Sequence, residues 1–289
     1  MAFNSVKEII DISEKENKLF WEVILESDMR ERLVSKEESM NQMKLLYDQM
    51  KETDRNYDKR LMSNSKLSGG DGQKIKVALA EGKMLSGNFI GTIMKKAIKT
   101  AESNACMKRI VAAPTAGSCG VVPSVLLTYQ EQYDIPDEKM LEALYVSSGI
   151  GQVIAERASI SGAEGGCQAE IGSASAMTAG AIAYLQGGDN ECISNASAFA
   201  LKSLLGLVCD PVAGLVEVPC VKRNVIGAVN AVTSADMAIA GVKSKIPLDE
   251  VIDAMRSVGD QLPETLRETS GGGLAVTPTG IKIAKDLER

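Results

Sequence analysis

Apolar residues recur along this chain mostly at the three- and four-residue spacing of amphipathic helices, and few segments alternate as half-buried strands would. Residues 174–185 and 225–240 are apolar nearly all round, which indicates helices at the centre of the molecule. We therefore expect an all-α fold, a multi-helix domain with a buried central helix core and glycine-rich loops between its helices. The pattern predicts helices at 76–104, 119–133, 137–158, 167–186, 190–207, 220–241 and 248–257.

The N-terminal part of the chain has a different character. Residues 1–62 are highly charged, and their apolar positions, such as Val6 and Ile9 or Met43 and Met50, keep helical spacing. A serine- and glycine-rich stretch at 63–73 follows, and beyond it charges become fewer. This predicts a charged helical N-terminal region at 1–62 and a helical domain at 75–289, unless the stretch is an internal loop of one continuous domain.

Composition excludes several common kinds of active site. The chain has 289 residues, of which 45% are hydrophobic and only 4% aromatic, which suits closely packed helices better than an aromatic-rich β-sandwich. It contains no histidine. A Ser-His-Asp triad, a Cys-His pair and a histidine-ligated zinc site are therefore excluded within this chain.

Charge and hydropathy indicate a soluble protein. The chain has 38 acidic and 32 basic residues, a net charge of -6, and its basic residues are scattered along the sequence rather than grouped as in a nucleic-acid footprint. No apolar run reaches the roughly 20 residues needed to cross a bilayer, and the first residues lack a basic segment followed by an apolar one. We expect a cytoplasmic protein whose six cysteines remain reduced.

Four glycine-rich loops stand out as candidate functional segments. Three of them contain or border cysteine, and three lead into a predicted helix, where free backbone N–H groups favour anions such as a carboxylate. The loops are 113–120, 161–167, 209–220 and 269–275.

The cysteines do not form a compact metal motif, because no two have the C-x-x-C spacing. Cys167, Cys209 and Cys220 lie at predicted helix ends, where a thiolate can be stabilised. Cys106 and Cys192 lie in ordinary helical stretches, as small buried side chains do. From position alone, the first three can be either metal ligands or buried apolar residues.

Three separated motifs resemble the α chain of iron–sulfur-dependent L-serine dehydratase. The resemblance covers about residue 75 to the end and is specific, because the motifs occur in the same order. They are Pro-Thr-Ala-Gly-Ser-Cys-Gly (114–120), Gly-Cys-Gln-Ala-Glu-Ile-Gly-Ser-Ala-Ser-Ala-Met (166–177) and Cys-Asp-Pro-Val-Ala-Gly-Leu-Val-Glu-Val-Pro-Cys (209–220).

The resemblance implies a cofactor and a reaction. Cys167, Cys209 and Cys220 would hold a [4Fe–4S] cluster whose fourth iron, lacking a cysteine, acts as a Lewis acid on the serine hydroxyl. L-serine would be deaminated to pyruvate and ammonia. A separate β subunit would complete a hetero-oligomer, and the 75–289 region would be the catalytic domain.

The sequence departs from the family pattern in two places. Ala116 stands where the family often has asparagine, which puts a side-chain contact to substrate there in doubt. The last residues, Lys-Asp-Leu-Glu-Arg, lack the terminal cysteine of some fused relatives, so we expect that mode of occupying the free iron to be missing.

Two of the loops are candidates for anchoring the substrate carboxylate through hydroxyls and backbone N–H groups. Plain turn chemistry, with glycine supplying positive φ, is the alternative for both loops and for the 270–273 segment. The candidate substrate-binding residues are Thr115, Ala116, Gly117, Ser118, Ser161 and Gly162.

The base that removes the α-proton is not identified by the sequence. Without histidine, the candidates are a carboxylate such as Glu164, a lysine of depressed pKa such as Lys222 or Lys243, or a group from the partner chain, which we favour.

Three other functions stay open. The 270–274 loop superficially resembles the phosphate loop of pyridoxal-phosphate enzymes, but no Ser-x-Lys-x-Arg segment offers a Schiff-base lysine. A related iron–sulfur lyase acting on L-cysteine or L-threonine would use the same cluster chemistry. A non-catalytic cluster-bearing subunit would explain the missing histidine.

Overall fold

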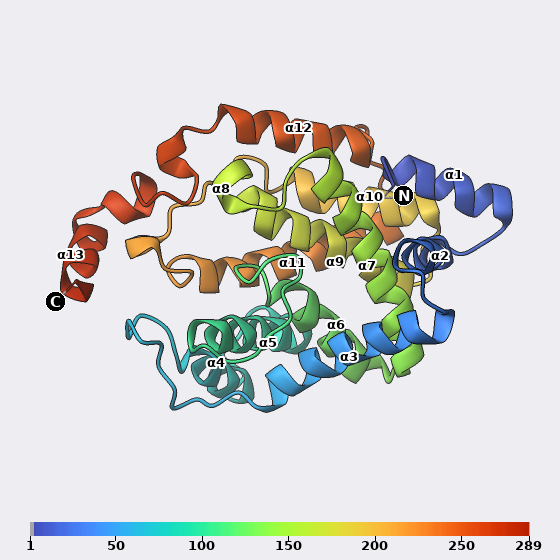
Figure 1. Cartoon of the computed structure of the whole chain (residues 1–289). Helices are drawn as coiled ribbons and strands as arrows, with labels where there is room; N and C mark the ends of the chain where they lie inside the picture. The colour runs from blue at the N-terminus through green and yellow to red at the C-terminus, as the bar shows by residue number, and fades with distance from the viewer. Residues whose placement is uncertain (1–2, 289) are drawn as a thin grey trace.

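The computed structural model describes residues 3–288, and these residues form thirteen α-helices joined by short 3₁₀ and π turns. No strand occurs among them; the nearest approach to one is an isolated bridge between Cys209 and Arg267. The predicted all-α fold is confirmed (Figure 1). None of the helices in this part of the chain is long and apolar enough to cross a membrane.

The centre of the molecule is α9 (Ser173–Leu185), where every residue from 173 to 183 is buried. It is surrounded by α6 (Val121–Tyr133), α7 (Asp137–Arg157), α10 (Asn190–Lys202) and α11 (Cys220–Ile239) (Figure 1). Small residues allow this close approach: a Cβ on Gly180 would lie 2.3 Å from Ile150 Cδ1. The prediction of a buried central helix is confirmed for α9.

The same prediction is wrong for α11, which packs only one face against its neighbours. That face contacts α5 (Gly87–Ala105), α6, α9 and α10. On the opposite face Ile226 is 57% exposed and Met237 is exposed as well, and Ile239 is exposed at the end of the helix. An all-round apolar sequence therefore marks a helix with an uncovered apolar face here, rather than a second central helix.

The N-terminal region forms α1 (Val6–Glu16), α2 (Phe20–Arg32) and α3 (Lys36–Arg55). Ser35 begins α3 with a capping box, in which its hydroxyl accepts from Glu38 N while the Glu38 carboxylate accepts from Ser35 N. α2 lies along α7, where a Cβ on Gly149 would lie 2.2 Å from Ile24 Cδ1. These helices share one hydrophobic core with the rest of the chain, and the division at 62 and 75 stays a prediction.

Several predicted helix boundaries need correction. The segment 76–104 is two helices, α4 (Asp71–Ala80) and α5, because Gly82 and Gly87 take positive φ between them. The segment 167–186 opens with a π turn, η1 (Gln168–Gly172), and α10 ends at Lys202. The predicted helix at 248–257 is α12 (Leu248–Gln261), and α13 (Pro278–Leu287), which was not predicted, follows it. The remaining short elements are α8 (Gly162–Gly165) and the 3₁₀ turns η2 (Val212–Gly214), η3 (Glu264–Leu266) and η4 (Gly273–Val276).

Candidate functional site

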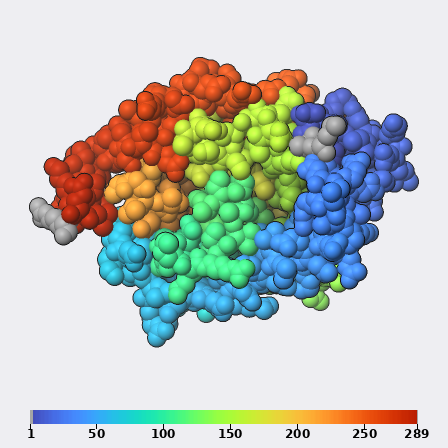
Figure 2. Space-filling model, viewed as in Figure 1, coloured from blue at the N-terminus to red at the C-terminus, as the bar shows by residue number. Residues whose placement is uncertain are grey.

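Three of the glycine-rich loops meet near the middle of the molecule. The 113–120 loop leads into α6, the 161–167 loop contains α8 and leads into η1, and the 209–220 loop leads into α11. The green, yellow-green and orange parts of the chain adjoin on the face shown in Figure 2. The expectation that three loops deliver the chain into a helix is confirmed.

The three cysteines of the predicted ligand set lie together and are buried. Cys167 immediately precedes η1, Cys209 pairs with Arg267 in the isolated bridge, and Cys220 is the first residue of α11. Their exposed fractions are 1%, 2% and 5%. Cys209 therefore lies beside a bridging segment and not at the end of α10, as the sequence had suggested.

The thiols influence one another's ionisation. A hydrogen bond from Cys209 lowers the pKa of the Cys167 thiol, and the positive charge of Arg223 acts in the same direction. The same hydrogen bond, together with burial, raises the pKa of Cys209. Burial and the nearby charge of Cys167 raise the pKa of Cys220 to about 12. The three sulfur atoms thus form one electrostatic unit, drawn from three separate loops.

The first turn of α11 ties these loops to one another. Arg223 donates to Val208 O at 2.8 Å and to Asp210 Oδ1 at 2.9 Å. Asn224 donates to the carbonyls of Gly117 and Cys220 and accepts from Gly120 N at 2.8 Å. The side chains that follow Cys220 therefore fix the position of the 113–120 loop against the cysteines.

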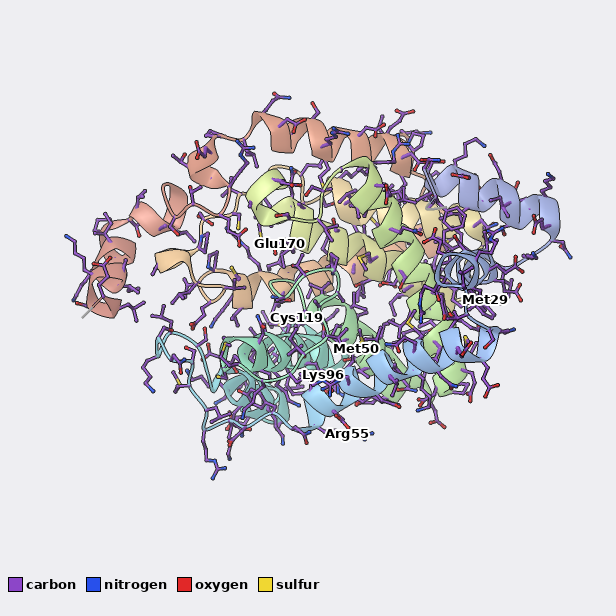
Figure 3. The ribbon with its side chains drawn as sticks, in the orientation of Figure 1. Met29, Met50, Arg55, Lys96, Cys119 and Glu170 are labelled. Carbon is purple, nitrogen blue, oxygen red and sulfur yellow. The ribbon has the colours of Figure 1, made fainter. Side chains whose placement is uncertain are left out.

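Glu170, on the π turn, is the residue that sequence reasoning missed. The hydroxyl of Thr115 donates to its Oε1 at 2.7 Å. Cβ atoms built on Gly117 and Gly162 would lie 2.9 Å from Oε1 and 2.8 Å from Oε2, and the one on Gly162 would also lie 3.0 Å from Cys209 Sγ. Two glycines from separate loops therefore enclose this carboxylate beside the cysteines, and Figure 3 shows it between α8 and the loop before α6.

The surroundings of Glu170 favour its protonated form. Burial raises the pKa of its carboxyl, and the negative charge of Glu268 adds to this effect, against the hydrogen bond from Thr115 and the charge of Arg223. A carboxyl with a raised pKa, enclosed next to small backbone, has the properties of a group that exchanges protons with a bound molecule.

The predicted substrate-binding residues fall on the two loops that enclose Glu170. Of these, Thr115, Gly117 and Gly162 approach it directly. Ser118 is fully buried and its hydroxyl accepts from Thr115 N, so it stabilises the turn. Ala116 contributes its carbonyl, which accepts from Asn104, and Ser161 begins α8, its carbonyl accepting from Gly165 N.

The three candidate bases named from the sequence lie elsewhere. Glu164 accepts from the Ser159 hydroxyl on the far side of α8 from Gly162, in a pocket between α8 and α12. Lys222 is ion-paired with Asp71. For Lys243 the expected pKa depression is wrong, because its hydrogen bond to Glu191 raises the pKa.

The segment that superficially resembled a phosphate loop has a structural role. Ser270 donates to Pro211 O at 2.7 Å, and Leu274 N donates to Asp210 Oδ2 at 2.8 Å. Gly273, at φ 58°, leaves no room for a Cβ, which would lie 2.4 Å from Asp210 Oδ2. These contacts hold the 269–275 segment against the 209–214 loop.

The other three cysteines do not join the group. Cys119 is completely buried and its thiol lies 3.9 Å from Thr100 O, with its pKa raised to about 12 by burial. Cys192 lies in the first turn of α10. Cys106 caps the end of α5, not the inside of a helix as expected.

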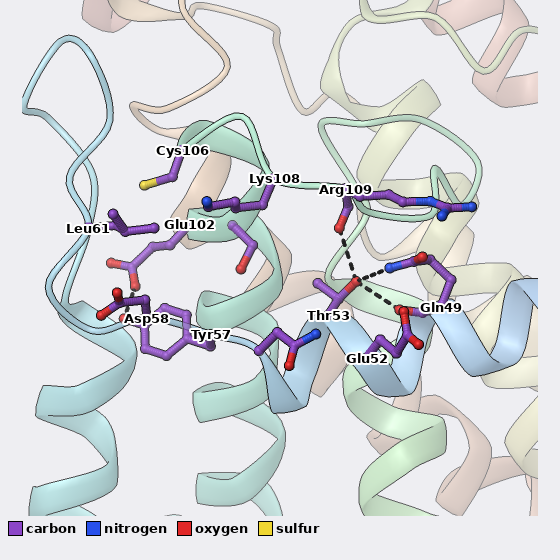
Figure 4. Close-up of a pocket in the computed structure, with 12 residues that line it drawn as sticks. Gln49, Glu52, Thr53, Tyr57, Asp58, Leu61, Glu102, Cys106, Lys108 and Arg109 are labelled. Carbon is purple, nitrogen blue, oxygen red and sulfur yellow. Dashed lines mark hydrogen bonds between the residues drawn. The ribbon is translucent and has the colours of Figure 1, made fainter.

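Cys106 lines a separate pocket of about 300 Å³ between α3, α5 and the loop that follows α5 (Figure 4). Glu102, one of three carboxylates that line this pocket, accepts from the Tyr57 hydroxyl at 2.5 Å and from Asp71 N at 2.8 Å, at the beginning of α4. None of its lining residues belongs to the site around Glu170.

The donor atoms that the site offers to a metal group are sulfurs, since its three cysteines are free thiols. Within residues 3–288, no group of three or more histidine, cysteine, aspartate or glutamate side chains is arranged around one metal position. Cysteine thiolates are the usual ligands of iron–sulfur clusters, so three neighbouring buried thiols beside an arginine are compatible with such a group in their donor chemistry.

Comparison with known proteins identifies the family. The family described as serine dehydratase alpha chain matches residues 15–275. The chain belongs to this family. The match begins well before residue 75, so the family relationship includes most of the N-terminal helices, which the sequence motifs alone had not indicated.

Two relatives of the serine dehydratase alpha chain family match along nearly their whole length. The probable L-serine dehydratase alpha chain of Bacillus subtilis is 47% identical over 285 residues, covering 99% of this chain and 95% of that protein. The L-serine dehydratase alpha chain of Peptoniphilus asaccharolyticus is 41% identical, covering 98% of each. The L-serine dehydratase of Helicobacter pylori is 37% identical over 95% of this chain, which spans 62% of that longer protein.

Proposed function

We propose that this chain is the catalytic α subunit of an L-serine dehydratase, which converts L-serine to pyruvate and ammonia in the cytoplasm. The observation that carries the proposal is the group of three buried thiols beside the enclosed carboxylate of Glu170, in a chain of the serine dehydratase alpha chain family. The names of its relatives favour serine over L-cysteine or L-threonine as the substrate.

Cys167, Cys209 and Cys220 would hold a [4Fe–4S] cluster. Their burial, their mutual influence on pKa and the neighbouring Arg223 support this ligand set. When bound, the cluster supplies a Lewis acid that helps the β-hydroxyl of serine to leave, since it has one corner without a cysteine. A guanidinium close to the thiolates offsets their negative charge.

This chain's own residues would orient the amino acid and move its α-proton. Backbone at Gly117 and Gly162 borders the space around Glu170, so a substrate there would meet the two loops and the carboxylate together. Glu170 in its ionised form would take the α-proton while the hydroxyl departs from the β-carbon. The resulting aminoacrylate tautomerises and hydrolyses to pyruvate and ammonium. With Glu170 in this role, the partner chain need not supply the base.

A β subunit would complete the enzyme. The alpha-chain names of the relatives imply a second chain, and the Helicobacter pylori relative is longer than this chain. Exposed apolar side chains on the outer side of α11, at its last residue and just beyond its end give such a partner a surface to cover. They are Ile226, Met237, Ile239, Val242 and Ile246.

Reconstitution tests the proposal directly. The purified chain is loaded anaerobically with iron and sulfide, its iron and sulfide are quantified, and pyruvate formation is measured with and without a candidate β chain. Steady-state rates are compared on L-serine, L-threonine and L-cysteine. A clear preference for L-cysteine would contradict the assignment of L-serine as the substrate. A loaded complex that forms no pyruvate would contradict the proposed activity and favour a non-catalytic cluster-bearing subunit. An aldimine absorbance band with stoichiometric phosphate would instead indicate pyridoxal phosphate.

A further inference from the structure

A basic cavity lies apart from the site around Glu170. Its volume is about 620 Å³, within the range of pockets that hold small molecules. It is formed by the end of α3, the loop at 56–60, the first turns of α4 and one side of α5. Figure 3 labels Arg55, which lines the cavity, near the meeting of α3 with α5.

The charges that line this cavity are strongly unbalanced. Six cationic side chains face a single lining carboxylate, Asp58, although the chain as a whole has a net charge of -6. This cluster of positive charge could not be predicted from the sequence, because the contributing residues come from three separate segments. The six are Arg55, Lys59, Arg60, Lys76, Lys95 and Lys99.

Neighbouring acids neutralise only two of the six. Arg60 pairs with Asp58 at 3.1 Å, and Lys99 pairs with Asp54 at 2.6 Å. Asp54 also binds Lys96, which in turn binds Glu131.

The other acids near the cavity are committed elsewhere. Glu102 accepts from Tyr57 and from the backbone that begins α4, and Asp71 pairs with Lys74 and Lys222.

Four cationic groups therefore stay without an ion pair within residues 3–288: Arg55, Lys59, Lys76 and Lys95. Burial lowers the pKa of Lys95, and the positive charges of Lys96 and Lys99 lower it further. Like charges held together around a concave surface focus an electrostatic potential that attracts anions.

The arrangement suits phosphate groups. Guanidinium and ammonium groups are the side chains that bind phosphate, arginine through two parallel hydrogen bonds and lysine as a point charge. A phosphate group carries about 1.5 to 2 negative charges at neutral pH, so four unpaired cations match roughly two phosphate groups. A long nucleic acid is disfavoured, because outside this cavity the acidic surface would repel it.

We propose that the cavity between α3, α4 and α5 is a binding site for a small molecule that carries two or more phosphate groups. The site is separate from the serine dehydratase site, because the two share no lining residue. Its existence does not depend on the proposed function.

The test is calorimetric titration of the purified chain with inorganic tripolyphosphate and, separately, with ATP, at several sodium chloride concentrations. We expect saturable one-to-one binding that weakens as salt rises. In the double variant R55M/K76M, affinity should fall tenfold or more, because two of the four unpaired cationic side chains that would bind phosphate are removed. Stronger binding of ATP than of tripolyphosphate would place a nucleoside among the ligands.

Two further variants control for fold and for net charge. K282M/K285M, on exposed positions of α13, removes the same charge away from the cavity and should leave binding unchanged. R55K/K76R keeps both charges in the cavity and should restore most of the affinity.

Three results would overturn the proposal: no binding of either probe to the wild-type chain, equal weakening in the α13 variant, or unchanged binding in R55M/K76M with its fold intact by circular dichroism. If the cavity variant instead lost affinity for a β chain while no phosphate compound bound, the cavity would be a protein-docking surface.

Discussion

The sharpest test of the proposed chemistry is the substitution Glu170→Gln. Glutamine has nearly the same shape, fits the same space between Gly117 and Gly162, and still offers an oxygen to the Thr115 hydroxyl that now donates to Oε1 at 2.7 Å. Only the capacity to accept a proton is removed. Because a positioned base contributes typically 10²- to 10⁴-fold to rate, kcat should fall by about that factor.

Pyruvate formation by the anaerobically loaded enzyme, coupled to lactate dehydrogenase, measures this loss, and iron content and thermal unfolding are recorded beside it. The matched control is Glu164→Gln, since Glu164 lies on the other side of α8 and bonds Ser159. That variant should keep near wild-type activity. Glu170→Gln with full iron and undiminished kcat would refute the role of base, and loss of iron together with activity would assign Glu170 to holding the cysteine site instead.

The pH profile provides an independent readout of the same carboxyl. Glu170 acts as a base only when ionised, so the rate should rise with pH through its pKa, which burial and the charge of Glu268 hold above the ordinary value. Glu268→Gln removes one of the causes that raise the pKa. The acidic limb should then move to lower pH, and a limb that stays in place or moves to higher pH would contradict the assignment.

Three further predictions concern the cysteines and the loops. Replacing any one of Cys167, Cys209 and Cys220 by serine should abolish both the brown chromophore and activity. Cys106→Ser and Cys192→Ser should preserve both, as measured by iron analysis and absorbance. Iron content that does not change in any of the first three variants would contradict the proposed ligand set. Gly162→Ala should lower activity and iron binding, because its Cβ would lie 3.0 Å from Cys209 Sγ and overpacking of this kind costs ~1–3 kcal/mol. Wild-type iron content and kcat in this variant would contradict the prediction and show that the 161–167 loop moves to accommodate the methyl group. Cys119→Ser should reduce activity while leaving iron unchanged, since this thiol belongs to the 113–120 loop and is buried against Thr100 of α5, away from the other three. A parallel loss of iron would contradict that separation.

Hydrophobic pattern predicted the helices better than it predicted their environment. Both 174–185 and 225–240 read as apolar all round, yet only α9 is enclosed by other helices, whereas α11 leaves Ile226 and Met237 exposed. The pattern measures the side chains of one helix, and it holds no information about whether a neighbour covers each face. The break between α4 and α5 was missed for a similar reason, because apolar spacing continues while Gly82 and Gly87 turn the backbone through positive φ.

The candidate site was predicted in part. The motifs named three cysteines that the fold brings together, and two loops that the fold places around one carboxylate. The carboxylate of Glu170 was overlooked in favour of Glu164, which belongs to the glycine-rich loop at 161–167. A signal was present, because Glu170 is the single charged residue between positions 165 and 185, in an otherwise uncharged and largely buried segment. A lone charge in such a segment is costly unless it has a partner or a function.

In the proposed mechanism, the enclosure of Glu170 explains how this chain can manage without histidine. A carboxyl exposed to water ionises too readily to be an effective base near neutral pH, and burial corrects this by raising its pKa. Here that burial is produced by backbone at Gly117 and Gly162, where any larger side chain would collide with the carboxylate. The small residues of the two loops therefore set the basicity of the site as well as its shape. It follows that a single methyl group added at either glycine should damage function more than removal of an exposed charge such as Lys222 or Lys243.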